Sequence, residues 1–258
     1  MDGAAPGATQ ALPDSGLGEA AQALESEGYA FVRAPTFRTA LTAAGLRDWD
    51  GFAASWDALG QDQYMADGGR YRSRRFATFA VSATAVERKP HQPHYQSRDY
   101  NTLNGGIARW FEPVTDAIAS HPATTSIIRV CNTLFTGLTP AERRPRSWHA
   151  ELHQFRIAAS ADAEGRPTPE GMHRDGVDYV LVLLIARHNV ASGTTIIGAP
   201  NGLAHGSFTL TSPFDAMMLD DHRVFHGVTA IEPIDATRLA KRDVLVVTFK
   251  AVDDKSLT

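Results

Sequence analysis

The chain has 258 residues and a formal net charge of −4, with 43% hydrophobic and 21% charged residues. This is the composition of an ordinary globular protein, and it has no basic excess that would attract nucleic acid or anionic lipid. The single cysteine, Cys131, excludes an internal disulfide framework and favours a reducing compartment. No apolar run approaches the roughly 20 residues that a membrane span requires. We therefore expect a cytoplasmic protein without nucleic-acid or membrane partners.

The first residues, "MDGAAPGATQALPDSG", are rich in alanine, glycine and proline. They lack the basic start and the apolar core of a secretory signal. We expect residues 1–16 to form a flexible N-terminal tail and residues 17–258 to form a single domain.

The first half of the domain has apolar residues at helical spacing. A first helix is predicted to end at Gly28, before a short strand over Tyr29 to Val32. Further helices are predicted over 37–46, 48–59 and 116–138, the last of them broken at Pro122.

The second half changes to short segments rich in β-branched and aromatic residues, separated by turn signals such as Asn201-Gly202. Strands are predicted over 152–159, 177–188, 193–199, 206–212, 215–221, 223–231 and 242–249. Helices followed by many antiparallel-looking strands indicate an α+β fold with a double-sheet β roll as its core.

A polar triplet stands at the start of the longest apolar strand, in "EGMHRDGVDYVLVLLIA" (170–186). On an extended strand His173 and Asp175 project to the same side, so an imidazole and a carboxylate would face one metal ion together. The triplet His-Arg-Asp also occurs in the kinase catalytic loop, but the glycine-rich phosphate loop and the Asp-Phe-Gly signature are absent from the chain.

A later segment, "DDHRVFHGVTAI" (220–231), supplies a third ligand. Two histidines and one carboxylate, with the remaining positions open, form the facial triad of non-haem Fe(II) oxygenases. His222 is a rival to His226. We favour His226, because Gly227 after it allows close approach to a ligand.

Oxygenases of this kind that use 2-oxoglutarate need a buried cation for its distal carboxylate. Arg242 begins a strand shortly after His226, and the planar fork of arginine pairs well with a carboxylate. Arg223 is the alternative anchor. Thr194 and Thr195 could add a hydroxyl to the same carboxylate.

A second histidine pair occurs in "HAELH" (149–153). In the zinc-protease motif the glutamate directly follows the first histidine, whereas Ala150 intervenes here. The surrounding segment alternates like a strand, so a zinc-protease helix is not expected.

Three of these segments together, "GMHRDGVDYVLVLLIARHNVASGTT", "DDHRVFHGVTAI" and "RDVLVVTF", resemble the bacterial 2-oxoglutarate/Fe(II)-dependent dioxygenases typified by L-isoleucine dioxygenase, which hydroxylate free aliphatic L-amino acids. The resemblance extends to 71–79, 94–113 and 151–157. One departure lies after the long strand: a basic-asparagine pair followed by two glycines would be expected, and the chain has "RHNVASGTT".

The resemblance implies a double-stranded β-helix (jelly-roll, cupin-like) core with the N-terminal helices packed on one sheet. It implies His173, Asp175 and His226 as Fe(II) ligands and Arg242 as the 2-oxoglutarate anchor. The implied reaction uses O2 and 2-oxoglutarate to hydroxylate an unactivated C–H of a free L-amino acid, with release of succinate and CO2.

For the substrate, the matching segments offer several polar groups. We expect Gln154, Arg156, Asp178 and Tyr95 to contribute to its binding. Two alternatives stay open: the same chemistry on an N-acylated, peptidyl or carrier-bound amino acid, and a non-catalytic β-roll binding protein. The sequence also leaves the oligomeric state open, a homodimer included.

Overall fold

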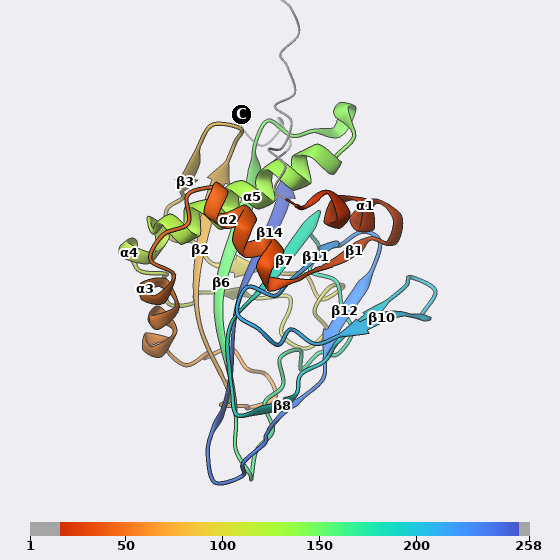
Figure 1. Cartoon of the computed structure of the whole chain (residues 1–258). Coiled ribbons are helices and arrows are strands. Elements are labelled where there is room, and N and C mark those ends of the chain that lie inside the picture. Colours follow the sequence, from red (N-terminus) through yellow and green to blue (C-terminus); the bar gives the residue numbers. More distant parts are fainter. Residues whose placement is uncertain (1–15, 253–258) are drawn as a thin grey trace, which may run out of the picture.

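The computed structural model describes residues 16–252 (Figure 1). The tail predicted over 1–16 therefore lies, apart from Gly16, outside the described residues.

Helices occupy the first half of the described chain, as expected. Their bounds are α1 (Gly18–Glu27), α2 (Ala34–Ala43), α3 (Trp49–Ala54), η1 (Ser55–Ala58), α4 (Asp116–Ala119), α5 (Pro122–Leu138) and η2 (Ala141–Arg143). Gly28 ends α1 in the left-handed conformation, with φ of 81°. The predicted break at Pro122 is confirmed, because this proline is in the first turn of α5 and His121 accepts a hydrogen bond from the N–H of Ala123.

A seven-stranded antiparallel sheet forms the centre of the molecule, in the order β1-β11-β7-β14-β6-β2-β3. A smaller sheet has the order β10-β9-β12, and two-stranded sheets pair β13 with β8 and β4 with β5. The bounds are β1 (Tyr29–Val32), β2 (Arg72–Val81), β3 (Val86–Arg88), β4 (His94–Tyr95), β5 (Ala108–Arg109), β6 (Trp148–Ala159), β7 (Tyr179–His188), β8 (Val190–Ser192), β9 (Thr195–Gly198), β10 (Ala204–Phe208), β11 (Ala216–Asp220), β12 (Phe225–Val228), β13 (Ile231–Pro233) and β14 (Ala240–Ala251).

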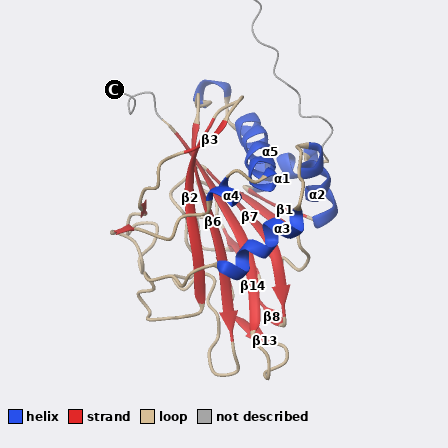
Figure 2. Cartoon of the chain, turned by 90° about the vertical axis from the view of Figure 1, so that its left-hand side faces the viewer, coloured by secondary structure: helices blue, strands red, loops and turns tan. Residues whose placement is uncertain are grey.

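The helices cover one face of the large sheet (Figures 1 and 2). Residues of alternate parity on β6, such as Ala150 and Leu152, point into this layer and are fully buried. They share a core with Phe135 of α5, which stacks on Tyr179 and lies edge-on to Phe249. This apolar layer fixes the position of the central strands β6, β7 and β14.

The opposite face of the large sheet packs against the smaller sheet. Val182 of β7, Met217 of β11 and Val244 of β14 form one buried cluster with Ile197 of β9. The structure is thus mostly β, with one large antiparallel sheet, a second sheet facing it and helices on the outside. The predicted α+β class is confirmed at this level.

One long strand was not predicted. β2 begins with "RSRR", and charged residues are depleted in strands, so the segment lacks the usual strand signal. It is held on the sheet by register with β6, in which Arg74 opposes Phe155 and Phe76 opposes His153. Side chains that alternate along β2 therefore reach both faces of the sheet.

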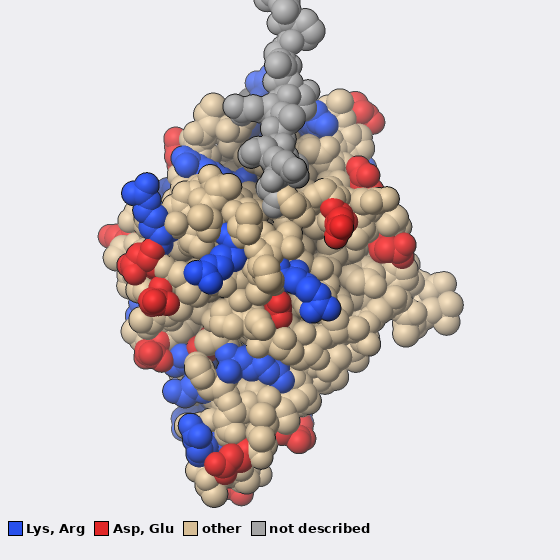
Figure 3. Space-filling view, viewed as in Figure 1, with Lys and Arg blue, Asp and Glu red and all other residues tan. Residues whose placement is uncertain are grey.

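Within residues 16–252, no helix is both long enough and apolar enough to cross a membrane. On the face shown in Figure 3, Lys and Arg side chains are interspersed with Asp and Glu side chains.

Candidate active site

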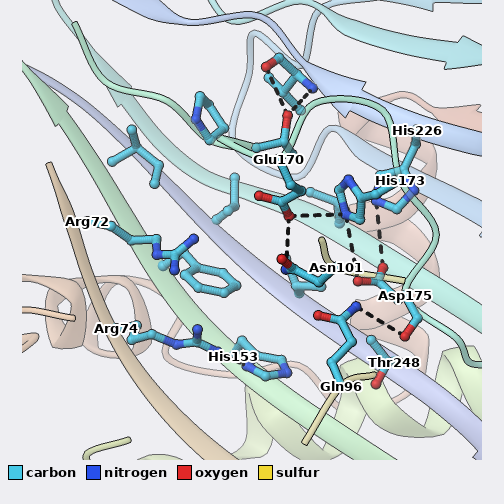
Figure 4. Close-up of a pocket in the computed structure, with 18 of the residues that line it drawn as sticks. Arg72, Arg74, Gln96, Asn101, His153, Glu170, His173, Asp175, His226 and Thr248 are labelled. Carbon is cyan, nitrogen blue, oxygen red and sulfur yellow. Dashed lines mark hydrogen bonds and ion pairs between the residues drawn. The ribbon is translucent and has the colours of Figure 1, made fainter. Parts of the chain in front are cut away.

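A cavity of about 130 Å³ lies between the two sheets. Its walls combine apolar side chains with an unusual number of charged ones (Figure 4). The apolar part is formed by Phe155, Ile157, Pro167, Val177, Val182, Met217, Val228, Val244 and Val246. The polar part is formed by Arg72, Arg74, His94, Gln96, Asn101, Arg109, Glu151, His153, Thr168, Glu170, His173, Asp175, Thr195, His226, Arg242 and Thr248.

Two histidines and an aspartate converge at one end of the cavity. The Nε2 atom of His173 lies 3.8 Å from Oδ1 of Asp175, and Nε2 of His226 lies 3.7 Å from Oδ2 of the same carboxylate. The two imidazole centroids are 4.4 Å apart, and one ligand atom from each of the three residues lies within 4.8 Å of the others. The three side chains thus approach one another closely enough to hold one metal ion.

The backbone explains this convergence, and it differs from the prediction. His173 and Asp175 were expected on a strand, but they precede β7 in a segment that pairs with β12 only through an isolated bridge between His173 and His226. Two N–H···O bonds of 2.9 Å link the backbones of these histidines. The segment is separated from β7 for a local reason. Gly176 adopts φ of 79°, which turns the chain away from extended geometry directly after Asp175.

Neighbouring groups orient the three side chains. Nδ1 of His173 lies 3.0 Å from the carbonyl oxygen of Gly171, which as acceptor fixes the Nδ1–H tautomer and leaves Nε2 free to bind a metal. The Asp221 carboxylate accepts hydrogen bonds from the N–H groups of Asp175, Gly176 and Val177, at 2.9, 2.7 and 3.1 Å. The loop that carries Asp175 is therefore clamped to β11 and the turn after it.

The electrostatics of the site suit a cation. Burial lowers the pKa of His173, but the charges of Asp175 and Glu170 outweigh it, so that this pKa lies above its ordinary value. Burial and the nearby His173 hold the pKa of His226 well below its usual range. Burial and the Asp175 carboxylate raise the pKa of Asp221 to about 6. A divalent ion between these groups would offset the carboxylate charges that cause two of the shifts.

Arg242 projects from β14 into the same cavity and is 2% exposed. Its Nε and Nη2 atoms have no hydrogen-bond partner in the described part of the chain. Burial, with a smaller contribution from Arg187, lowers its pKa to about 10. A buried cation without a counter-ion is costly to the fold, and the cost is removed when a carboxylate ligand pairs with it. The site therefore fits both a divalent metal and an anionic co-substrate.

A family model, described as 2OG-Fe dioxygenase, matches residues 53–248, which is most of the chain. The chain belongs to the 2OG-Fe dioxygenase family. It is therefore an enzyme of this class, and the family uses Fe(II), 2-oxoglutarate and O2. The resemblance recognised in the sequence is confirmed.

Individual relatives support the same assignment. L-isoleucine-4-hydroxylase of Bacillus thuringiensis is 28% identical over 164 residues, which cover 63% of this chain and 67% of the relative. The 3(1)-hydroxy-L-isoleucine 4-dioxygenase of Pantoea ananatis is 23% identical over 168 residues, which cover 64% and 66%. The chain thus matches about two thirds of the length of these curated relatives. The crystal structure of a BsmA homologue from Methylobium petroleophilum PM1 is 34% identical with a TM-score of 0.80, covering 90% of this chain and 92% of that one.

In this dioxygenase the alternative metal ligand, His222, and the alternative 2-oxoglutarate anchor, Arg223, lie away from the cavity. His222 is paired with Asp178 at 2.9 Å, and its side chain is 60% exposed. Arg223 donates to the carbonyl oxygens at the end of α1, the usual role of a basic residue near a helix C-terminus. Thr194 bonds to Thr209, whereas the next residue, Thr195, lines the cavity and is 1% exposed. Of the two threonines that the sequence offered, only Thr195 lines the cavity.

The structure places all four predicted substrate residues outside the cavity. On β6 the odd-numbered side chains face the cavity, so Gln154 and Arg156 point to the helical face, where they contact Ser55 of η1 and Asp57 of the same helix. Asp178 accepts hydrogen bonds from the N–H of Ala251 and from His222. Tyr95 is 61% exposed. For these four residues the sequence prediction requires correction.

The four residues expected to bind the substrate did not include the two arginines of β2 that reach the cavity. Arg72 donates to Asp62 at 2.8 Å, and Arg74 lies 3.5 Å from the same carboxylate. The guanidinium of Arg74 also lies over the rings of Phe111 and Phe155, at 3.4 and 4.4 Å from their centroids. Alternation along "RSRR" places Arg72 and Arg74 on one face, and this was the available signal.

A second histidine cluster stands beside these arginines. Glu151 lies 2.8 Å from Nδ1 of His94 and 3.5 Å from Nε2 of both His149 and His153. Although these groups are close enough to hold a metal, the guanidinium of Arg74 donates to Nδ1 of His153. An imidazole that accepts at Nδ1 carries its proton on Nε2, which then donates to Glu151 and cannot bind a metal. The cluster is therefore best described as a hydrogen-bonded wall of the cavity.

Acid is expected to destabilise the metal-free protein through His153. Burial lowers the pKa of His153 to about 3, below its ordinary value of 6.5. Between these values the unfolded chain binds a proton that the folded protein does not, so stability present above pH 6.5 is lost as the pH falls. At pH 5 the loss attributable to this residue is about 2 kcal/mol. Urea unfolding of wild type and His153→Asn at pH 7 and pH 5 measures it.

In that experiment the stability of His153→Asn should fall less with acid than that of the wild type. The exposed His188 provides the matched control, because His188→Asn should keep the wild-type slope. Equal slopes for wild type and His153→Asn would contradict the assignment of a buried neutral imidazole.

Proposed function

We propose that this 2OG-Fe dioxygenase hydroxylates an unactivated C–H of a free L-amino acid. The observation that carries the proposal is the opening of the His173–Asp175–His226 group and of Arg242 into one cavity that also contains both positive and negative side chains. The names of the two curated relatives, both of which refer to isoleucine or its hydroxylated form, support the same substrate class. The two facing sheets are inferred to form a double-stranded β-helix.

Each group has a chemical task in this proposal. His173, Asp175 and His226 would hold Fe(II) through three donors, leaving its other positions open. Arg242 would pair with the distal carboxylate of 2-oxoglutarate, and the hydroxyl of Thr195, which lines the same cavity, could donate a hydrogen bond to it. When bound, Fe(II) activates O2, so that 2-oxoglutarate is oxidised to succinate and CO2 while one oxygen atom is inserted into the substrate C–H.

The apolar wall performs a further task. Val182, Met217, Val244 and Val246 pack together and line the cavity with apolar side chains. Such a wall excludes water and holds an aliphatic side chain in van der Waals contact. A carboxylate at position 175 also occupies the position that a halogenase would leave to chloride, so hydroxylation is the expected outcome.

The test is a substrate screen with the protein reconstituted with Fe(II), 2-oxoglutarate and O2. The twenty common L-amino acids and their N-acetyl derivatives are assayed for succinate and for a product heavier by one oxygen atom. At least one free amino acid should give equal amounts of succinate and hydroxylated product. Turnover of N-acetyl derivatives alone would overturn the proposal of a free substrate. Lack of 2-oxoglutarate consumption with every compound would overturn the proposed reaction.

A further inference from the structure

The charged groups of the cavity are almost all paired. Arg72 and Arg74 share Asp62, and Glu151 is surrounded by His94, His149 and His153. Asp175 lies between two imidazoles, and in the proposed function Arg242 pairs with the distal carboxylate of 2-oxoglutarate. Two further groups each keep a buried polar atom that no described residue bonds to: Nε of Arg109 and Oε2 of Glu170.

Arg109 is the last residue of β5 and is 2% exposed. Over residues 16–252 it forms no ion pair within 4.0 Å, and its Nε atom is buried without a hydrogen-bond partner. Its guanidinium lies 5.6 Å from the centroid of Phe111. Burial, together with repulsion from Arg72, lowers the pKa of Arg109. It is thus a second buried cation that lines the cavity and makes no direct ion pair with any described residue.

Glu170 lies at the metal-binding end of the cavity (Figure 4). Its Oε1 atom is 3.7 Å from Nε2 of His173 and 3.5 Å from the amide nitrogen of Asn101. Its Oε2 atom is buried and accepts no hydrogen bond from any described residue. A carboxylate oxygen in this position needs a donor that the protein itself does not supply.

The two groups act on the same space without touching. Both side chains line the same cavity, and within residues 16–252 they form no ion pair with each other. Burial and Arg72 lower the pKa of Arg109, and the negative charges of Asp62, Glu170 and Glu151 oppose this in part. A small molecule with one negative and one positive group could pair with both. An α-amino acid has these two charges on a single carbon atom, whereas a simple fatty acid or an amine has only one of them.

We propose that Arg109 and Glu170 are the receptor for the charged head group of the amino-acid substrate, with Arg109 binding its carboxylate and Glu170 its ammonium. This deepens the proposed function and rests on it. Because Glu170 lies beside His173, the ammonium and its carbon are held at the metal-binding end, and the aliphatic side chain extends along the apolar wall. The pair thereby sets which carbon is presented for oxidation.

Because Arg109 and the Oε2 atom of Glu170 are buried, the site should select ligands that have both charges. A ligand that lacks either charge leaves one of two buried groups unpaired, and such sites reject the incomplete analogue strongly. We expect wild type to bind L-isoleucine at least 100-fold more tightly than 3-methylpentanoate, which lacks the ammonium, and 2-methylbutylamine, which lacks the carboxylate.

The experiment is calorimetric titration of these three compounds into protein loaded with 2-oxoglutarate and with Mn(II), which replaces Fe(II) so that no turnover occurs. Glu170→Gln should weaken L-isoleucine at least 30-fold and leave 3-methylpentanoate unchanged, since that ligand has no ammonium to lose. Arg109→Gln should weaken L-isoleucine to a similar extent and leave 2-methylbutylamine unchanged. Arg109→Lys should restore part of the affinity. A purely structural role would weaken all three ligands together.

Two exposed residues of the same segments serve as controls. Arg98→Gln and Glu164→Gln should bind L-isoleucine like the wild type. The inference alone is overturned if the wild type binds L-isoleucine and Arg109→Gln or Glu170→Gln binds it equally well. It is also overturned if Glu170→Gln loses Mn(II), which would make Glu170 a metal ligand, or if Arg109→Gln loses 2-oxoglutarate. Failure of every amino acid to bind the wild type would instead overturn the proposed function.

Discussion

Asp175→Ala is expected to lose Fe(II) binding and with it substrate-dependent formation of succinate, by at least 100-fold. Asp175 contributes the only carboxylate of the three converging donors, with its two oxygens 3.8 and 3.7 Å from the imidazoles of His173 and His226. Replacement of groups that merely orient metal ligands already costs about 10–100-fold in affinity or activity, so loss of a ligand should cost more. Without the carboxylate, two neutral imidazoles remain to hold the metal.

Anaerobic titration with Fe(II) in the presence of 2-oxoglutarate measures this loss directly, because the bound chelate has a weak visible charge-transfer band. Wild type should develop the band and Asp175→Ala should not. Asp162→Ala removes an exposed aspartate from the same half of the chain and should behave like the wild type. If Asp175→Ala kept full turnover, the assignment of the metal site would be wrong.

The sequence was sufficient to select the three converging residues because each signal was local. His173 and Asp175 are separated by one residue, and Gly227 marks the segment that carries His226. Long-range pairing then decided between His226 and His222. The backbone of His226 bonds to that of His173, while His222 lies in the turn between β11 and β12. No sequence pattern specifies that pairing, but the apolar run that follows Asp175 placed the strand next to it correctly.

Predictions of individual site residues failed where they depended on which face of a strand a side chain occupies. Gln154 was expected to reach the substrate, yet its neighbours His153 and Phe155 line the cavity. A shift of one residue reverses every side chain of a strand, and alternation alone does not say which set faces the ligand. Alternation likewise did not decide between the two adjacent candidates Thr194 and Thr195, of which only Thr195 lines the cavity.

Other residues of the site were beyond local reasoning. Arg109 is on a two-residue strand, and Glu170 is in a loop before the segment that carries His173 and Asp175. Neither residue has a periodic pattern around it. What distinguishes them is that each has a buried polar atom to which no described residue bonds. The sequence thus selected the three side chains that converge, whereas Arg109 and Glu170 reach the cavity only through contacts between distant segments.

Arg242→Met is expected to bind 2-oxoglutarate at least 30-fold more weakly than the wild type and, without the co-substrate, to be more stable. The first effect follows from removing one partner of a buried charge pair, which costs about 2–5 kcal/mol of binding free energy. The second follows from the free protein, in which Arg242 is 2% exposed and burial lowers its pKa to about 10. Methionine is shorter than arginine but flexible and uncharged, so it removes a desolvated charge, and the gain should be about 1–3 kcal/mol.

Two effects of Arg242→Met together distinguish an arginine that anchors 2-oxoglutarate from one that supports the fold: the variant should be more stable, and it should respond less to 2-oxoglutarate. Thermal unfolding with and without 2-oxoglutarate measures both, because a ligand stabilises the folded state in proportion to the logarithm of its concentration over Kd. Without ligand the Tm of the wild type should be the lower of the two, and it should rise with 2-oxoglutarate. The Tm of Arg242→Met should start higher and begin to rise only at 2-oxoglutarate concentrations at least 30-fold greater. Arg238→Gln, an exposed arginine just before β14, should respond like the wild type. An arginine that merely supports the fold would give a less stable variant, since its removal would leave its partners unpaired. A destabilised Arg242→Met that still responded to 2-oxoglutarate would therefore assign the anchor to another residue.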